Sequence, residues 1–239
     1  MTEALLSALT LSTLAGAAIP AGAALASVER FMPNWIEDEF RHSVIAFGGG
    51  ALFSAIALVL VPEGAERVSA VPALACFILG GLVFLWADMA LERRGGRAAQ
   101  FMAMMLDFLP EAMALGALLS GDGQTATLLA VLIALQNLPE GFNAYRELQD
   151  NGPVRSSRLA LIFLLVVPVG PLAAFVGLTV LNQHPAVLGG IMLFAAGGIL
   201  YLLFEDVAPQ VPLERSWAPA LGGVVGFAFG FAGHLALSG

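Results

Sequence analysis

Eight long apolar runs divide almost the whole chain. Each is close to the roughly 20 residues that an α-helix needs to cross the hydrocarbon layer of a membrane. Because 59% of the residues are hydrophobic and only 12% are charged, the chain has too little polar surface to cover a soluble globule. We therefore expect an all-α, multi-pass membrane protein with one transmembrane domain over residues 1–239. The predicted helices cover residues 4–26, 41–61, 70–91, 98–119, 124–147, 156–181, 184–206 and 216–238.

The basic residues predict how this bundle lies in its membrane. All ten are arginines, and only Arg67 belongs to an even-numbered connection. Cytoplasmic loops are enriched in Lys and Arg, so we expect the odd-numbered connections to be cytoplasmic and both termini to be outside. No basic block could follow the phosphates of a nucleic acid. The arginines in or beside the odd-numbered connections are Arg30, Arg41, Arg93, Arg94, Arg97, Arg146, Arg155, Arg158 and Arg215.

Two similar polar motifs interrupt the fourth and fifth apolar runs, LDFLPEAMALG and LQNLPEGFNAY. Each has a polar residue three positions before a proline and a glutamate directly after it: Asp107, Pro110 and Glu111 in the first, Gln136, Pro139 and Glu140 in the second. The polar residues of each motif are four positions apart, so they project from one face of their helix. Each proline also leaves a carbonyl without its hydrogen bond, that of Leu106 or Leu135.

The two motifs should meet at one depth, because consecutive spanning helices run antiparallel and each motif lies near the middle of its run. Matched helix interruptions in two halves of a sequence are typical of the binding site of an inverted-repeat transporter. An ionised carboxylate at helix centre costs about 3 kcal/mol, and no Lys or Arg is available at this depth to neutralise three of them. The alternatives are that the prolines only bend the helices and that Gln136 only joins them. The matched pair favours a cation site.

At these residues the chain resembles the ZIP (zinc/iron-regulated transporter-like) family of divalent-metal permeases, in particular its bacterial branch. Family members carry an HNxPE-like motif on the fourth helix and a QDxPE- or HExPHE-like motif on the fifth. The segments FGGGALFSAIALVLVPEG and GGILYLLFEDVAP resemble the second and seventh helices of the family. The resemblance covers essentially the whole chain. It implies eight helices with outward termini in a bacterial inner membrane, import of zinc, manganese or iron, and a homodimer.

Departures from the family pattern predict one metal rather than two. Phe108 stands where the family has asparagine, Asn137 where it has aspartate, and Val167 where a glutamate precedes Pro168. What remains is a single site of Asp107, Glu111, Gln136 and Glu140, with Asp107 in place of a histidine. An all-oxygen shell suits manganese or ferrous iron and does not exclude zinc.

Three further acidic residues lie near helix ends and are candidates for a cation pathway. Glu63 closes the second helix on the outer side, where it could attract cations. Glu205 and Asp206 lie near the inner end of the seventh helix, where relatives often bind metal. The alternative for all three is a solvated helix end.

Two other functional classes fit the same motifs less well. A transport-inactive metal-binding or sensing relative is compatible with the missing ligands. An intramembrane metalloenzyme would need an open metal site and a general acid or base, commonly with histidine ligands, and the chain has three histidines, all at helix ends. The single cysteine excludes a thiolate cluster within one chain. We expect no catalytic residue and no prosthetic group, the metal ion being the substrate.

Overall fold

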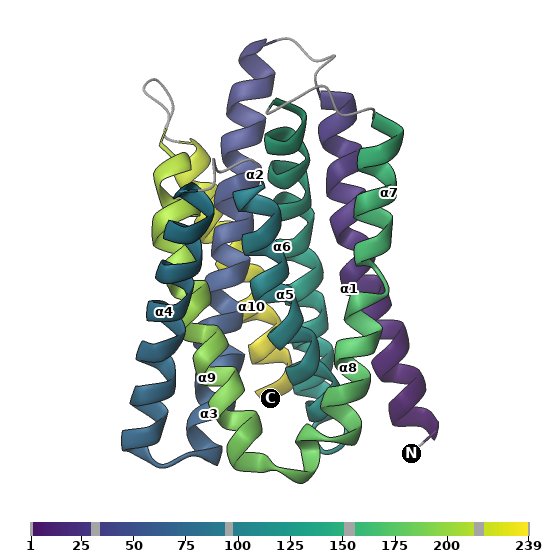
Figure 1. Ribbon diagram of the computed structural model, residues 1–239, viewed down its shortest axis with the longest axis vertical. Coiled ribbons are helices and arrows are strands. Elements are labelled where there is room, and N and C mark those ends of the chain that lie inside the picture. The colour runs from purple at the N-terminus through teal and green to yellow at the C-terminus, as the bar shows by residue number, and fades with distance from the viewer. Residues whose placement is uncertain (1, 30–33, 94–97, 151–155, 213–217, 239) are drawn as a thin grey trace.

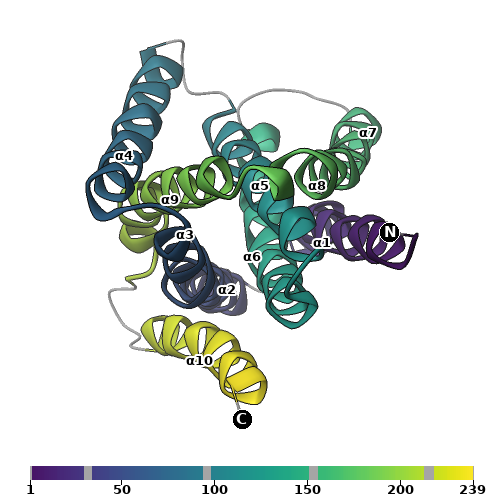
Figure 2. The same ribbon diagram turned by 90° about the horizontal axis from the view of Figure 1, so that it is seen from below.

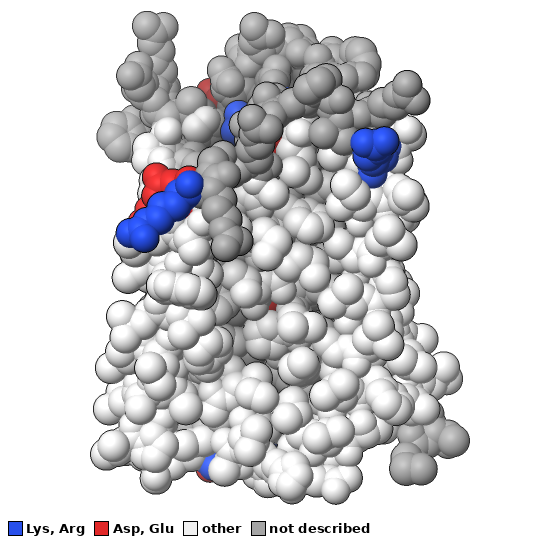
Figure 3. Space-filling model, in the orientation of Figure 1, with Lys and Arg blue, Asp and Glu red and all other residues white. Residues whose placement is uncertain are grey.

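The computed structural model describes residues 2–29, 34–93, 98–150, 156–212 and 218–238, and within these ranges every regular element is a helix. Among the described residues, eight helical spans are long and apolar enough to cross a membrane, as predicted. They run side by side, and α1 begins at the same end of the bundle at which α10 ends (Figure 1). On the face shown in Figure 3, most of the described charged side chains lie toward the two ends, and only a small patch of Asp or Glu is visible in the broad band between them.

Five spans are single helices: α1 (Thr2–Glu29), α4 (Ala70–Arg93), α5 (Ala99–Leu118), α6 (Gly123–Asp150) and α10 (Ala218–Ser238). The second span consists of α2 (Asn34–Ala55), a π-helical segment η1 (Ile56–Leu60) and α3 (Val61–Arg67). The sixth consists of α7 (Ser156–Val166) and α8 (Val169–Thr179), followed by η2 (Leu181–Gln183). The seventh consists of α9 (Pro185–Leu202), a π-helical segment η3 (Leu203–Val207) and η4 (Ala208–Gln210).

Prolines explain where these three spans depart from the continuous helices predicted from sequence. Pro168 separates α7 from α8, because proline cannot donate a backbone hydrogen bond and disfavours the helical conformation of the residue before it. Pro62 and Pro209 each lie two positions after the last residue of a π-helical segment. π-helical turns inside α-helices occur frequently at functional sites.

Helices α5 and α6 occupy the middle of the bundle, and the others surround them (Figure 2). The most extensive contacts join α1 to α6, α8 to α5, α2 to α10 and α4 to α9. Helices α4 and α10 lie at the periphery and expose a row of large apolar side chains that lipid would cover. Examples are Val71, Leu74, Ile78 and Leu82 on α4, and Leu221, Val224 and Phe229 on α10.

Each of these four helix pairs is in backbone contact at a reciprocal pair of glycines. A Cβ atom added to any of these glycines would collide with a backbone carbonyl oxygen of the facing helix. Small residues of this kind permit the close packing on which membrane helices depend. The glycine pairs are Gly22 and Gly141 between α1 and α6, Gly116 and Gly177 between α5 and α8, Gly50 and Gly226 between α2 and α10, and Gly80 and Gly197 between α4 and α9.

A short turn joins α5 to α6 and makes them antiparallel neighbours. Asp122, directly before α6, accepts hydrogen bonds from the backbone N–H groups of Gln124 at 3.1 Å and Thr125 at 3.0 Å, and from the Thr125 hydroxyl. These bonds, led by that of the hydroxyl, lower the pKa of the Asp122 carboxyl. The carboxylate thereby satisfies N–H groups that have no partner within the helix.

Candidate metal centre

The structure brings the two polar motifs together, each residue against a residue of the other motif. The Gln136 amide Nε2 on α6 donates a hydrogen bond of 2.6 Å to Oε2 of Glu111 on α5. The Asp107 carboxyl on α5 lies within hydrogen-bonding reach of the Glu140 carboxyl on α6. Asp107 is 3% exposed, and Glu111 and Gln136 are completely buried. The structure thus brings the four residues of the two motifs together between α5 and α6.

Each of the four predicted ligands keeps one buried oxygen atom that has no hydrogen-bond partner. These atoms are Oδ1 of Asp107, Oε1 of Glu111, Oε1 of Gln136 and Oε2 of Glu140. A buried polar atom without a partner costs about 1–3 kcal/mol, and most such atoms in native proteins are paired. An amide oxygen and an ionised carboxylate can only accept a hydrogen bond, whereas a protonated carboxyl can donate one. These atoms therefore need either protons or a cation, and one cation could satisfy all four together.

Within the described residues, no group of three or more His, Cys, Asp or Glu side chains stands arranged as a set of metal ligands. Glu111 is hydrogen-bonded to Gln136, and Asp107 lies beside Glu140. A cation that drew on the unpaired oxygens would have to replace these two contacts. The four side chains lie close together but are not arranged around one centre.

The three residues at which the sequence departs from the family pattern, Phe108, Asn137 and Val167, contact neighbouring helices. Phe108 is completely buried, and a Cβ atom added to Gly170 or Gly16 would lie 2.8 or 3.1 Å from its Cζ atom. The ring therefore fills the space between α5, α1 and α8. Asn137 donates a hydrogen bond of 2.9 Å to the carbonyl oxygen of Ala15 on α1. Val167 lies at the break between α7 and α8, and its carbonyl also faces Gly16.

The structure treats the three pathway candidates differently. Asp206, on η3, lines a small cavity of about 20 Å³ that Asp107 and Glu140 also line. Glu205 is exposed. Glu63 forms a salt bridge of 2.6 Å with Arg67. Glu63 lies near the end of the second span, at the opposite end of the bundle from Asp206. Only Asp206 is thus placed next to the centre.

The sequence matches no protein-family model and no curated protein.

Sequence reasoning missed one charged residue that belongs to this region. Glu147 on α6 accepts hydrogen bonds from the backbone N–H groups of Ala99 and Gln100, the first two residues of α5. Its signal was its spacing: it lies seven positions after Glu140, on the same face of α6. Near the end of a predicted helix, a glutamate at that position resembled an ordinary solvated residue.

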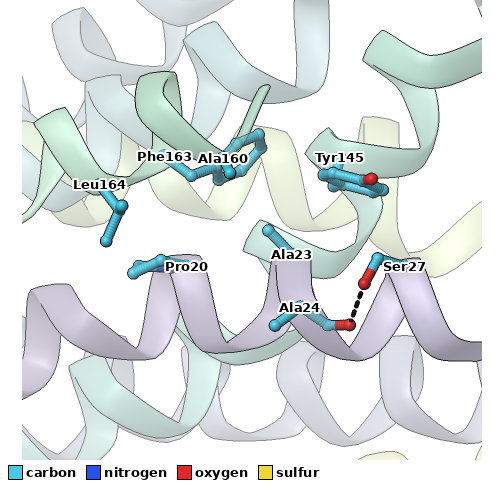
Figure 4. Close-up of a pocket in the computed structure, with 8 residues that line it drawn as sticks. All are labelled: Pro20, Ala23, Ala24, Ser27, Tyr145, Ala160, Phe163 and Leu164. Atoms are coloured by element: carbon cyan, nitrogen blue, oxygen red, sulfur yellow. Dashed lines mark hydrogen bonds between the residues drawn. The ribbon is translucent and has the colours of Figure 1, made fainter. Parts of the chain in front are cut away.

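A separate cavity of about 330 Å³ lies between α1, α6 and α7. Pro20, Phe163 and Leu164 line it with apolar surface, and Tyr145 closes one end (Figure 4). The hydroxyl of Ser27 at its edge donates a hydrogen bond of 2.7 Å to the carbonyl oxygen of Ala24. None of the four predicted ligands lines this cavity, so it is not part of the candidate centre.

Proposed function

We propose that this protein is a ZIP-like membrane transporter that imports divalent transition-metal cations, zinc or manganese and iron, through a single site between α5 and α6. Asp107, Glu111, Gln136 and Glu140 are the proposed ligands. The proposed setting is a bacterial inner membrane with both termini outside and the arginine-rich connections in the cytoplasm.

One observation carries this proposal: four buried oxygens without hydrogen-bond partners, one from each residue predicted as a ligand. Three of the four residues are acidic, and each would cost about 3 kcal/mol if ionised at the membrane centre. Helix α5 contains no Lys or Arg, and α6 has none before Arg146. A divalent cation would offset this charge and satisfy the four oxygens at once. Oxygen ligands are those that manganese and ferrous iron accept readily.

The helix packing supports an inverted repeat as the framework of a transporter. If the first three spans correspond to the last three and α5 corresponds to α6, then the α1–α6 pair corresponds to α8–α5 and α2–α10 to α9–α4. These four pairs make the most extensive contacts in the described bundle. The π-helical segments also fall in corresponding spans, the second and the seventh. In transporters of this construction the substrate binds at the repeat interface near the bilayer midplane, which here lies between α5 and α6.

The cavity shared by Asp107, Glu140 and Asp206 supports a route from the centre toward the arginine-rich end. We place cation release along it, with Asp206 as the next carboxylate after the centre. Glu63 lies toward the other end, and its salt bridge with Arg67 would weaken its attraction for an entering cation.

Uptake by purified protein in liposomes tests the function directly. We expect proteoliposomes to accumulate at least one of Mn²⁺, Fe²⁺ and Zn²⁺ faster than protein-free liposomes, as measured by inductively coupled plasma mass spectrometry. Ligand deprotonation accompanies metal binding, so uptake should fall as the external pH is lowered. Saturable binding without accumulation would identify a metal-binding or sensing protein instead. Neither binding nor accumulation of any of the three would contradict the proposal.

The packing of Phe108 and Asn137 predicts how many cations the centre holds. We expect equilibrium dialysis to give one tightly bound metal ion per chain, and anomalous scattering to give one peak between α5 and α6. Loss of this metal in the Glu111→Ala variant would assign it to the centre. Two peaks about 4 Å apart, the spacing of two-metal sites, would show that the ring and the amide do not exclude a second cation.

A further inference from the structure

The first turn of α5 is held by a side chain from α6 and not by its own sequence. Ala98, the residue directly before α5, has no side-chain atom that could accept a hydrogen bond. Glu147 supplies both acceptors: Oε1 lies 3.1 Å from the Ala99 nitrogen and Oε2 lies 3.0 Å from the Gln100 nitrogen. A carboxylate is the group that best satisfies these N–H groups, because a helix N-terminus also carries partial positive charge.

Side-chain contacts thus join α5 and α6 at two levels along the bundle axis. The central contacts use Gln136, Glu111, Asp107 and Glu140, which are the proposed ligands. A cation bound there would compete for those oxygens. The Glu147 contact uses no proposed ligand, so it can persist whether or not the centre is occupied.

The part of α5 that Glu147 holds forms one wall of the cavity leading away from the centre. Gln100, Ala103 and Met104 line this wall, and Asp206 lines the cavity from η3. The cavity measures about 20 Å³, enough for roughly one water molecule and too little for a hydrated divalent cation. Its width depends on where the first turns of α5 lie.

We propose that Glu147 is a positioning residue that latches the start of α5 to α6 and keeps the passage between the centre and Asp206 narrow. Release of the latch lets the first turns of α5 move away from the passage. That the passage carries cations rests on the proposed function, but the latch itself does not.

The substitution Glu147→Gln is the sharpest perturbation. It preserves the size of the side chain but leaves one acceptor oxygen and no charge, so one N–H group of α5 loses its partner. The Glu147→Asp variant keeps the charge and both oxygens on a shorter side chain, and should retain part of the latch.

The test measures how fast a cysteine in the passage reacts with a charged, membrane-impermeant thiol reagent. The reporter is Ala103→Cys in a Cys76→Ser background, since Cys76 is the only native cysteine. Adding Glu147→Gln should raise the labelling rate about 10-fold, the factor that corresponds to losing one charged hydrogen bond. Adding Glu147→Asp should raise it less.

A second reporter, Ser120→Cys, lies just after the other end of α5 and controls for general loosening. Its labelling rate should be unaffected by Glu147→Gln. An unchanged rate at position 103 would overturn the latch, as would equal increases at positions 103 and 120. Labelling requires no metal transport, so the two proposals can fail separately. If the protein fails the uptake test but Glu147→Gln raises the labelling rate at position 103, the latch is supported and the transport function is not.

Discussion

Replacing Glu111 or Glu140 with alanine should reduce metal uptake in proteoliposomes by about 100-fold or more. Loss of even an outer partner of a metal ligand typically costs 10- to 100-fold in affinity or activity, so loss of a ligand should cost at least as much. The measurement is the initial rate of uptake at several metal concentrations. Glu92→Ala is the matched control, because Glu92 is an exposed acidic residue near the end of α4. It should transport at the wild-type rate.

A second substitution separates ligand chemistry from packing. Glu111→Gln preserves volume and leaves an oxygen that can still accept the hydrogen bond from Gln136, so the variant should fold and elute from size-exclusion chromatography like the wild type. It should nevertheless transport poorly, because the charge is gone. Equal accumulation by the wild type and by both alanine variants would show that the centre between α5 and α6 is not the transport site.

Local patterns predicted the eight spans, which the described residues contain, and the four residues of the proposed centre, which lie together. Span lengths follow from bilayer thickness, and the faces of α5 and α6 follow from the four-residue spacing of their polar residues. Each of the four ligands predicted from that spacing has an oxygen that is buried without a partner, a property that Asn137, Asn143 and Asn182 share. Pairing of the motifs required only that consecutive spans be antiparallel and that both motifs lie near mid-span.

Contacts between distant parts of the chain could not be predicted from local sequence patterns. Glu147 caps a helix that begins 48 positions earlier, and Asn137 bonds to Ala15 across 122 positions. The location of Phe108 depends on glycines of α1 and α8, which no pattern within α5 reveals. The prolines were visible in the sequence, but whether each gives a bend, a π-helical turn or a break depends on what its neighbours can pack against.

Substituting alanine for Gly116 should destabilise the protein by about 2–3 kcal/mol and lower its melting temperature by roughly 5–10 °C, because the added methyl group would collide with the carbonyl oxygen of Ala174. Carbonyl oxygens of a helix cannot move aside as the end of a flexible side chain can, so α5 and α8 would have to separate. Thermal unfolding in detergent micelles, followed by intrinsic fluorescence, measures the change.

Gly141 faces the Ile19 carbonyl oxygen on α1 in the same way, and the α1–α6 pair that it joins is the proposed counterpart of the α8–α5 pair. Alanine at position 141 should therefore lower the melting temperature by a similar amount. Gly121→Ala is the control, since a Cβ atom there meets nothing within 4 Å, and its effect should stay within about 0.5 kcal/mol. If the variants at 116 and 141 have the same melting temperature as the control, close backbone contact at these glycines does not stabilise the helix pairs. If only one of them is destabilised, the two halves do not bear equivalent packing, and the inverted repeat loses its main support.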